Sequence, residues 1–317
     1  MSRVLLTGAS GFVGSHTAEA LLNEGHSVKA ALRKTSSLSK VPGKCEAARV
    51  DFLNPGNLQP HLQGIDVIYH IAGSTKAGSQ EEYDLANAAT TRALLKARET
   101  ACPESRFILV SSQSAAGPGG KGPTTPYGRS KLLAEECLRH ADNWTIVRPP
   151  AVMGPGDEAA APFFRMASRG LLMTPWVNRG GFCLIYVGDL ARLLTALPES
   201  PETRNAVLQP SYARLFTWKD FAELMREAAG RRVLHLRVPP PFVRAAGFLS
   251  EVWGAARGKH PIFDRHKSCE LLCCDWKLEA EETRRLTGWK PEVPPEEAFA
   301  RTMRSIVLGD GQSSSKK

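Results

Sequence analysis

The sequence predicts an α/β fold: a doubly wound parallel sheet with a smaller C-terminal lobe. In the first half of the chain, short apolar, β-branched runs alternate with segments that are apolar at helical spacing. A glycine-rich stretch joins the first such run to the first helical segment. After Arg148 the alternation stops, and proline, glycine and aromatic residues become denser. We therefore expect a sheet domain over residues 1–150 and a second lobe over residues 151–309, with some later segments returning to the sheet domain.

The individual elements follow from the same periodicities. The expected strands are Arg3–Leu6, Ser27–Leu32, Ala47–Val50, Val67–His70, Phe107–Val110 and Thr145–Val147, with a returning strand at Leu184–Val187. The expected helices are Val13–Asn23, Glu81–Glu99, Pro126–His140, a helix capped by Thr217 that runs to Ala229, and Pro295–Leu308. Residues 310–317, rich in Gly, Ser and Lys, are expected to form a disordered tail.

Composition is typical of a globular protein. An apolar fraction of 42% over 317 residues supports a packed core, and no apolar run approaches the roughly 20 residues that cross a bilayer. The N-terminus shows no signal-peptide profile, so a cytoplasmic location is expected. The net charge of +9 is not gathered in one block of Lys and Arg, and nucleic acid is therefore not expected as a partner.

The seven cysteines are scattered without Cys-x-x-Cys spacing, which favours reduced thiols. Cys269, Cys273 and Cys274 lie close together, but no His/Cys set of zinc-finger spacing accompanies them. No metal is expected, and the role of this group stays open.

The segment Thr7–Gly14 reads TGASGFVG and lies between the first strand and the first helix. In this context Gly8 permits a tight turn, Gly11 lets the backbone approach a pyrophosphate, and Gly14 lets the helix pack against the sheet. The pattern predicts a Rossmann dinucleotide site at the helix N-terminus. The residues expected to contact the dinucleotide here are Gly8, Ser10, Gly11, Phe12, Val13 and Gly14.

The end of the second strand indicates which dinucleotide binds. Arg33 and Lys34 stand where a carboxylate would bind the ribose hydroxyls of NAD. The planar guanidinium of Arg33 suits a 2′-phosphate, so NADP is the expected cofactor and NAD is the alternative. Solvated loop charges are the structural alternative for both residues. Asp51, which ends the third strand, is placed to bind the adenine, with Phe52 beside it.

A phenol and an ammonium four residues apart, on Tyr127 and Lys131, share one face of a predicted helix. The strand Phe107–Val110 is followed by two serines, of which Ser112 is expected at the sheet edge where ligands bind. A free phenol titrates at about 10, so a neighbouring cation must stabilise the phenolate for it to exchange protons near neutral pH. Lys131 is expected to supply that charge and to hold the nicotinamide ribose, while Ser112 donates to the reacting carbonyl oxygen.

In this order the motifs resemble the extended short-chain dehydrogenase/reductase family, which includes nucleotide-sugar epimerases, dihydroflavonol-type reductases and 3β-hydroxysteroid dehydrogenases. The resemblance covers nearly the whole chain and extends to the segments His70–Gly73, Asn87, Arg148–Pro150 and Tyr186–Asp189. It implies an NAD(P)-dependent enzyme in which Tyr127 is the general acid/base and Ser112 positions the substrate oxygen.

The resemblance also indicates residues around the cofactor. Ala72 and Gly73 are expected to contact the dinucleotide, and Pro149 and Val152 to pack the nicotinamide. His70 is expected to be structural. Helices flanking the tyrosine often build dimers in this family, which leaves a homodimer open.

The absence of residues that bind a diphosphate is one indication of the substrate class. Two places that bind the diphosphate in many nucleotide-sugar members hold Ala151 and Cys183–Ile185 here. The segment Pro162–Trp176 is rich in large apolar groups, which favours an apolar small molecule unless these groups form the core of the second lobe. The residues expected to contact substrate are Ser112, Phe163, Phe164, Met173 and Trp176.

We therefore expect an NADP(H)-dependent oxidoreductase that interconverts a hydroxyl and a carbonyl, with a 3β-hydroxy or 3-keto sterol or related polycyclic lipid as the first hypothesis. A nucleotide-sugar epimerase or dehydratase is the alternative, and a polar, arginine-lined second lobe would indicate it. A non-catalytic NADP-sensing regulator is a third possibility, against which the presence of the tyrosine and lysine argues.

A further stretch, Pro241–Gly258, indicates contact with lipid. Its apolar residues fall largely on one side of a possible helix, and basic residues flank them. The apolar residues are Phe242, Val243, Ala246, Leu249, Val252 and Trp253, and the basic ones Arg244, Arg257 and Lys259. Such a stripe lies in a bilayer interface or packs on its own domain, so loose membrane association is one of two open alternatives.

Overall fold

The computed structural model describes residues 1–258, 260–273 and 275–314. The chain divides into two compact units. Unit 1 comprises Met1–Pro149, Leu190–Pro210 and Glu279–Lys290; unit 2 comprises Pro150–Asp189, Ser211–Leu278 and the residues from Pro291 onward. Lys259 and Cys274, both named above, lie outside the described residues.

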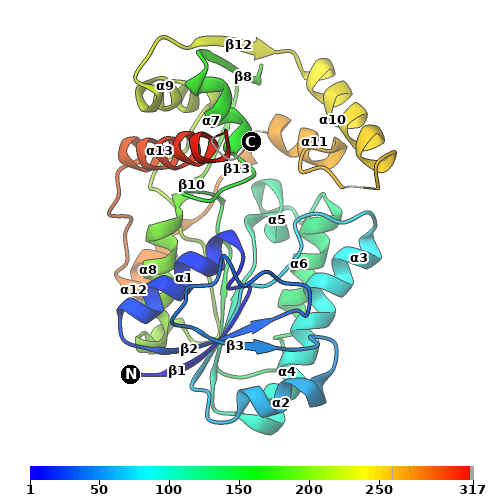
Figure 1. The fold of residues 1–317 in the computed structure, drawn as a ribbon, viewed down its shortest axis with the longest axis vertical. Coiled ribbons are helices and arrows are strands. Elements are labelled where there is room, and N and C mark those ends of the chain that lie inside the picture. Colours follow the sequence, from blue (N-terminus) through cyan, green and yellow to red (C-terminus); the bar gives the residue numbers. More distant parts are fainter. Residues whose placement is uncertain (259, 274, 315–317) are drawn as a thin grey trace. The chain divides into compact units, whose positions relative to one another are not determined.

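Unit 1 is built on a seven-stranded parallel sheet (Figure 1), which confirms the predicted fold class. Its strands are β1 (Arg3–Thr7), β2 (Ser27–Leu32), β3 (Glu46–Arg49), β4 (Val67–His70), β5 (Arg106–Val110), β6 (Trp144–Val147) and β11 (Ala206–Leu208). The strand order is β11-β6-β5-β4-β1-β2-β3, so the direction of winding reverses between β1 and β4. Strand β11 was not predicted because it has only three residues and follows Asn205, whose φ is 54°.

The helices of unit 1 connect these strands. They are α1 (Phe12–Asn23), α2 (Pro55–Leu62), α3 (Gln80–Asp84), the π-helix η1 (Leu85–Ala89), α4 (Thr90–Ala101), α5 (Gln113–Ala116), the 3-10 turn η2 (Pro118–Gly120), α6 (Pro126–Glu136), the 3-10 turns η3 (Leu197–Glu199) and η4 (Pro201–Thr203), and α12 (Ala280–Thr287). Helix α8 (Val187–Ala196) begins in unit 2 and ends in unit 1.

Two predicted helices of unit 1 differ clearly from the observed ones. The single helix expected over Glu81–Glu99 contains a π-helical turn at Leu85–Ala89. The helix expected to end at His140 ends at Glu136, because the next turn switches to hydrogen bonds between residues three apart, such as that from Leu138 N to Glu135 O.

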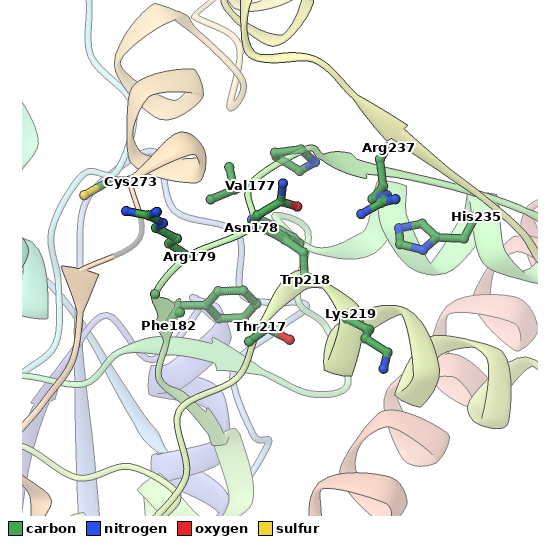
Figure 2. A pocket seen from close by; sticks show the side chains of 13 residues that line it. Val177, Asn178, Arg179, Phe182, Thr217, Trp218, Lys219, His235, Arg237 and Cys273 are labelled. Carbon is green, nitrogen blue, oxygen red and sulfur yellow. The ribbon is translucent and has the colours of Figure 1, made fainter.

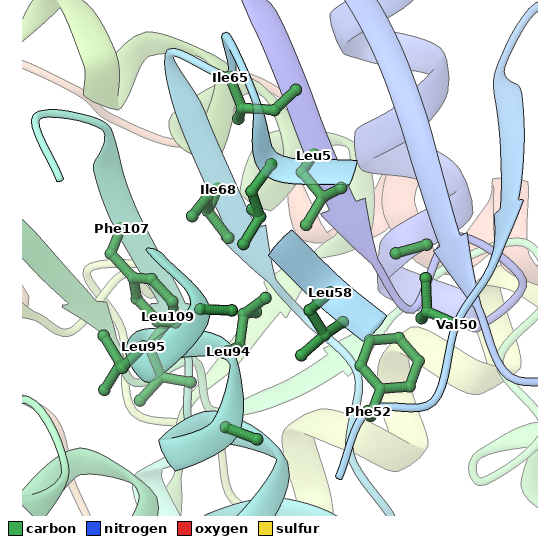
Figure 3. Packing of buried hydrophobic residues seen from close by; sticks show 14 of the residues in the cluster. Leu5, Val50, Phe52, Leu58, Ile65, Ile68, Leu94, Leu95, Phe107 and Leu109 are labelled. Atoms are coloured by element: carbon green, nitrogen blue, oxygen red, sulfur yellow. The ribbon is translucent and has the colours of Figure 1, made fainter. Parts of the chain in front are cut away.

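The sheet is buried on both faces. On one face, Ile68 and Phe107 pack with Leu58 of α2 and Leu94 of α4 (Figure 3), and these four side chains are at most 1% exposed. The next residue along β4, Tyr69, points to the other face, where its hydroxyl donates a 2.9 Å hydrogen bond to a backbone carbonyl of α8. Helices on both faces are the arrangement that a parallel sheet needs.

The loop between β1 and α1 depends on two glycines. Gly8 has a φ of +81°, and a Cβ on Gly14 would lie 2.0 Å from the Gly8 carbonyl oxygen. Gly11 is the N-cap of α1, and among the described residues no side chain caps this helix and no acidic residue lies in its first turn. The first-turn amides are therefore open to an anion.

Unit 2 contains shorter elements. They are β7 (Ala151–Met153), α7 (Ala161–Ser168), β8 (Leu171–Pro175), β9 (Gly181–Phe182), β10 (Leu184–Tyr186), α9 (Trp218–Ala229), β12 (Leu234–Val238), α10 (Pro240–Ala255), α11 (Arg265–Leu272), β13 (Asp275–Trp276) and α13 (Pro295–Ser314). The strands form three parallel pairs: β10 with β7, β12 with β8, and β13 with β9.

The cap predicted at Thr217 is present as a capping box with Asp220, at the start of α9. Helix α13 continues to Ser314, whereas the sequence predicts a disordered tail from Asp310; residues 315–317 of that tail lie outside the described residues. Within the part of the chain that the structure describes, no helix is both long and apolar enough to span a bilayer.

Gly14→Ala is expected to destabilise the protein although alanine is the better helix former by about 1 kcal/mol. The added Cβ must displace the backbone of the β1–α1 loop, and overpacking of this kind typically costs about 1–3 kcal/mol. Urea unfolding measures the difference. Gly43→Ala is the matched control, because a Cβ there meets no atom within 4 Å. Equal unfolding free energies for the two variants would contradict the close contact.

Candidate active site

Helix α6 presents the predicted acid/base pair. The Thr125 side chain accepts a hydrogen bond from Gly128 N and Pro126 occupies the first helical position, so the helix begins directly before Tyr127. Lys131 follows one turn later on the same face. A Cβ on Gly128 would lie 2.4 Å from the Ser114 carbonyl oxygen, and glycine thus lets α6 approach the segment that follows β5.

Lys131 is buried at 4% exposure, and its Nζ donates a 2.8 Å hydrogen bond to the carbonyl of Val110, the last residue of β5. Burial lowers the pKa of Lys131 to about 8, and the nearby Glu135 carboxylate opposes this shift. With that pKa, most of the amines still carry a proton at neutral pH. The end of β5 therefore holds a desolvated positive charge.

An ion pair lies behind this charge. Arg148, which follows β6, donates to both carboxylate oxygens of Glu135, at 2.9 and 2.5 Å, and the Ser111 hydroxyl donates to the same carboxylate at 2.5 Å. The Glu135 side chain is only 5% exposed. A buried carboxylate with three hydrogen bonds from two partners holds its position, so this network fixes α6 against the ends of β5 and β6.

Asn87 connects the loop after β4 to α6. Its Oδ1 accepts from Ser74 N at 2.8 Å, and its Nδ2 donates to Ser130 Oγ at 2.8 Å. Ser130 in turn donates to the carbonyl of Tyr127. The side chain is 2% exposed and lies in the π-helical turn. Asn87 is thus a positioning residue for the helix that carries the acid/base pair.

His70 ends β4 and is fully surrounded by protein. Its Nδ1 lies 2.8 Å from Thr7 Oγ1, and its Nε2 lies 3.0 Å from Thr91 Oγ1. Since Thr7 Oγ1 already accepts from two backbone amides, its own proton goes to Nδ1, which leaves the histidine proton on Nε2. Burial, followed by the charge of Lys131, lowers the pKa of His70 to about 3. His70 is therefore neutral, and its role is structural: it links the ends of β1 and β4 to α4.

Of the two predicted hydroxyl groups, that of Ser112 lies beyond the carboxyl end of β5 and that of Tyr127 belongs to helix α6. Ser112 is the second residue after the end of β5 and caps α5, since its Oγ accepts from Ser114 N at 3.1 Å. A hydroxyl that accepts in this way still carries a proton that it can donate to a substrate oxygen. Tyr127 is half-buried, and its ring centroid lies 6.1 Å from that of Tyr83.

The residues predicted to select the cofactor lie at the ends of β2 and β3. Arg33 and Lys34 are exposed. Arg49, which sequence reasoning missed, donates through Nη1 to the carbonyls of Arg33 and Ser36, at 2.7 and 2.6 Å, and so braces the loop that carries Arg33. Its place at the end of β3, beside β2 in the sheet, was the signal available.

Two further cofactor candidates have structural contacts of their own. Asp51 is exposed and its Oδ1 accepts from Leu53 N. The Phe52 side chain is buried in the core of unit 1, which leaves its backbone for any cofactor contact.

The remaining cofactor candidates fall in both units. Ala72 N donates to Thr7 Oγ1, and Gly73 lies beside the Asn87 side chain. Pro149 is buried, and its carbonyl accepts from Gln113 N. Val152 belongs to β7 of unit 2.

The predicted substrate residues of unit 2 divide into two groups. Phe164 is fully buried and its ring lies 5.8 Å from that of Phe299, and Phe163 packs against Phe221. These two rings contribute to the core of unit 2. Met173 and Trp176 are 40% and 46% exposed.

Unit 2 contains a cavity of about 620 Å³ between the 177–182 loop, β12 and the start of α9 (Figure 2). Three cationic side chains line it, Arg179, Lys219 and Arg237, together with His235 and the ring of Trp218, and no Asp or Glu is among its lining residues. Sequence reasoning missed this cavity because its cations come from three separate segments.

The cysteines that the structure describes do not belong to a metal site. Cys269 is exposed and Cys273 is half-buried, both as free thiols, and Cys273 lines the cavity of unit 2. Among the described residues, no group of three or more His, Cys, Asp or Glu side chains is arranged to hold a metal ion.

Comparison with known proteins identifies the family. The profile of the NAD dependent epimerase/dehydratase family matches residues 4–207. The chain belongs to this family. A ceramide reductase of Caulobacter vibrioides is 32% identical over 278 residues, which cover 86% of this chain and 85% of that protein. A UDP-glucose 4-epimerase of Vibrio cholerae is 27% identical over 338 residues, covering 98% and 97%.

The fold is shared with solved members of the family. A UDP-glucuronic acid 4-epimerase from Bacillus cereus, solved in complex with UDP-glucuronic acid and NAD, aligns with a TM-score of 0.73 at 20% identity and covers 96% of this chain and 99% of that one. The chain is accordingly an NAD(P)-dependent enzyme of the extended short-chain dehydrogenase/reductase type, acting on a small molecule.

Proposed function

We propose that this enzyme is an NADP(H)-dependent oxidoreductase that interconverts a ketone and a secondary alcohol on an apolar lipid. The observation that carries the proposal is the buried Lys131 ammonium, which lies one helical turn from Tyr127 and donates to the carbonyl of Val110, two residues before Ser112. A proton donor, a desolvated cation and a hydroxyl at one sheet edge are the groups that carbonyl reduction requires.

The residues of the β1–α1 loop fit a dinucleotide. A Cβ on Gly8 would lie 2.7 Å from Ala72 N, and the uncapped first turn of α1 offers amides to a pyrophosphate. We assign the 2′-phosphate of NADP to Arg33. The Arg33 side chain is exposed and can therefore reach a bound phosphate.

In the direction of reduction, the bound cofactor supplies a hydride to the carbonyl carbon. Ser112 donates a hydrogen bond to the carbonyl oxygen, and Tyr127 transfers its phenolic proton to that oxygen as negative charge develops there. The Lys131 ammonium stabilises the phenolate that remains, and Glu135 with Arg148 keeps the helix in place. Oxidation of the alcohol runs through the same groups in reverse, with Tyr127 as the base.

The proposed substrate is the keto or hydroxy form of a ceramide-type lipid, with a sterol as the second choice. The ceramide reductase match is the more identical of the two relatives described above. In unit 2, Ala151 carries no group that could bind a diphosphate, and Cys183, Leu184 and Ile185 are buried apolar residues. Met173 and Trp176 present apolar surface that a lipid chain can cover, at roughly 25 cal/mol per Å² buried.

One observation favours a second candidate function, the epimerisation of a nucleotide sugar. The cavity of unit 2 is lined by Arg179 and Arg237 and by no carboxylate, which suits a diphosphate. Neither a ceramide nor a sterol carries an anionic group, so this cavity supports the second candidate and has no role in the first.

Substrate turnover separates these functions. We expect NADPH consumption with a 3-keto analogue of ceramide or with a 3-keto sterol, and neither turnover nor thermal stabilisation with UDP-glucose. Tyr127→Phe should lower turnover at least about a hundredfold while the dissociation constant for NADPH changes little, because only the proton donor is removed. Binding of UDP-glucose with epimerisation would establish the second candidate, and near-normal turnover by Tyr127→Phe would refute the mechanism.

Arg33→Ala should weaken NADPH binding about tenfold or more relative to NADH, since a charge-assisted hydrogen bond contributes about 1.5–3 kcal/mol. Lys34→Ala is the matched control and should leave the preference nearly unchanged. Fluorescence titration of both cofactors measures the ratio. Equal affinity of the unmodified enzyme for NADPH and NADH would rule out this assignment of the 2′-phosphate.

A further inference from the structure

Helix α10 exposes an apolar face. Phe242, Leu249 and Trp253 are 67%, 64% and 67% exposed, and Phe248 and Val252 are 54% and 49% exposed. With 3.6 residues per turn these five side chains fall within an arc of about 140°. Such exposure is unusual for a surface helix, whose outer side is normally polar.

The opposite face of α10 already has its packing partner. Val243 and Gly247 are its buried residues, and a Cβ on Gly247 would lie 2.7 Å from the Asp264 carbonyl and 2.8 Å from the Ser268 side chain at the start of α11. An ion pair of 3.0 Å between Glu251 and Arg265 joins the same two helices. The apolar face that remains is therefore not the side by which α10 packs on unit 2.

Charge favours an anionic surface as the occupant of this face. Arg244 and Arg257 are exposed at the ends of the apolar arc, and the Arg257 guanidinium lies 3.9 Å from the ring centroid of Trp253. The chain as a whole carries a net charge of +9.

The size of the face argues against a second copy of the chain. Helix α10 has 16 residues, so it is about 24 Å long and about 10 Å wide. This is roughly 250 Å² in projection, whereas a stable protein interface buries about 800 Å² per partner. A bilayer interface has no such minimum area, and an apolar stripe with basic borders is the pattern of helices that lie in it.

We propose that α10 is an interfacial helix that docks unit 2 on an anionic lipid membrane. Phe242, Leu249 and Trp253 enter the boundary between headgroups and acyl chains, while Arg244 and Arg257 bind lipid phosphates. This inference goes beyond the proposed oxidoreductase function and does not depend on it, because docking requires neither substrate nor cofactor.

Sedimentation with vesicles tests the proposal on the full chain without substrate or cofactor. Vesicles of phosphatidylcholine with phosphatidylglycerol should bind the protein at low salt, and pure phosphatidylcholine should bind it more weakly. Leu249→Glu should reduce the partition coefficient at least about tenfold, because a charge replaces an apolar side chain that the lipid buries. Leu308→Glu in α13 is the matched control, since Leu308 is 67% exposed and the charge change is the same.

The control variant should bind as the unmodified protein does, and Arg244→Gln with Arg257→Gln should remove the preference for phosphatidylglycerol. Equal binding by the Leu249 and Leu308 variants, or no sedimentation of the unmodified protein at low salt, would overturn the proposal. A dimer that forms without vesicles and is lost in Leu249→Glu would assign the face to a second copy instead. Ketone reduction is measured separately, so failure here leaves the proposed function standing.

Discussion

The Lys131 ammonium constrains the structure around the end of β5, because a cation removed from water must be given acceptors and counter-charge. The Val110 carbonyl supplies one acceptor, and the Glu135 carboxylate supplies the charge. Glu135 is itself buried and needs partners, which Arg148 and Ser111 provide. Placing one charge at the sheet edge thus requires a supporting set of polar contacts that ties α6 to β5 and β6.

A second set of hydrogen bonds links the end of β1 to helix α6. His70 joins Thr7 at the end of β1 to Thr91, whose hydroxyl donates to the carbonyl of Asn87. The Asn87 side chain then holds Ser130, which neighbours Lys131. The strand that leads into the phosphate loop and the helix that carries the acid/base pair are therefore connected by buried hydrogen bonds, so the cofactor loop and the proton donor are held in one rigid unit.

Sequence patterns predicted the features that depend on residues close together along the chain. The alternation of apolar runs predicted six of the seven strands of the sheet, with each end within one residue, and the spacing of Tyr127 and Lys131 placed both on α6. Contacts between distant segments were not predictable. The place of Arg49 at the end of β3 indicates that it lies near β2 but not that it bonds the carbonyl of Arg33, and apolar identity does not distinguish Phe164, which is core, from Trp176, which is exposed. These differences arise from tertiary packing, which one sequence does not display.

Lys131 is a desolvated cation one helical turn from the proton donor Tyr127. The direct measurement is a pH titration of lysine side chains by NMR in the ligand-free enzyme labelled at lysine, with the Lys131 signal assigned by its absence in Lys131→Met. Burial predicts a pKa of about 8 for this group. A Lys131 signal that titrates near 10.5, the ordinary value for lysine, would show that the ammonium is not desolvated.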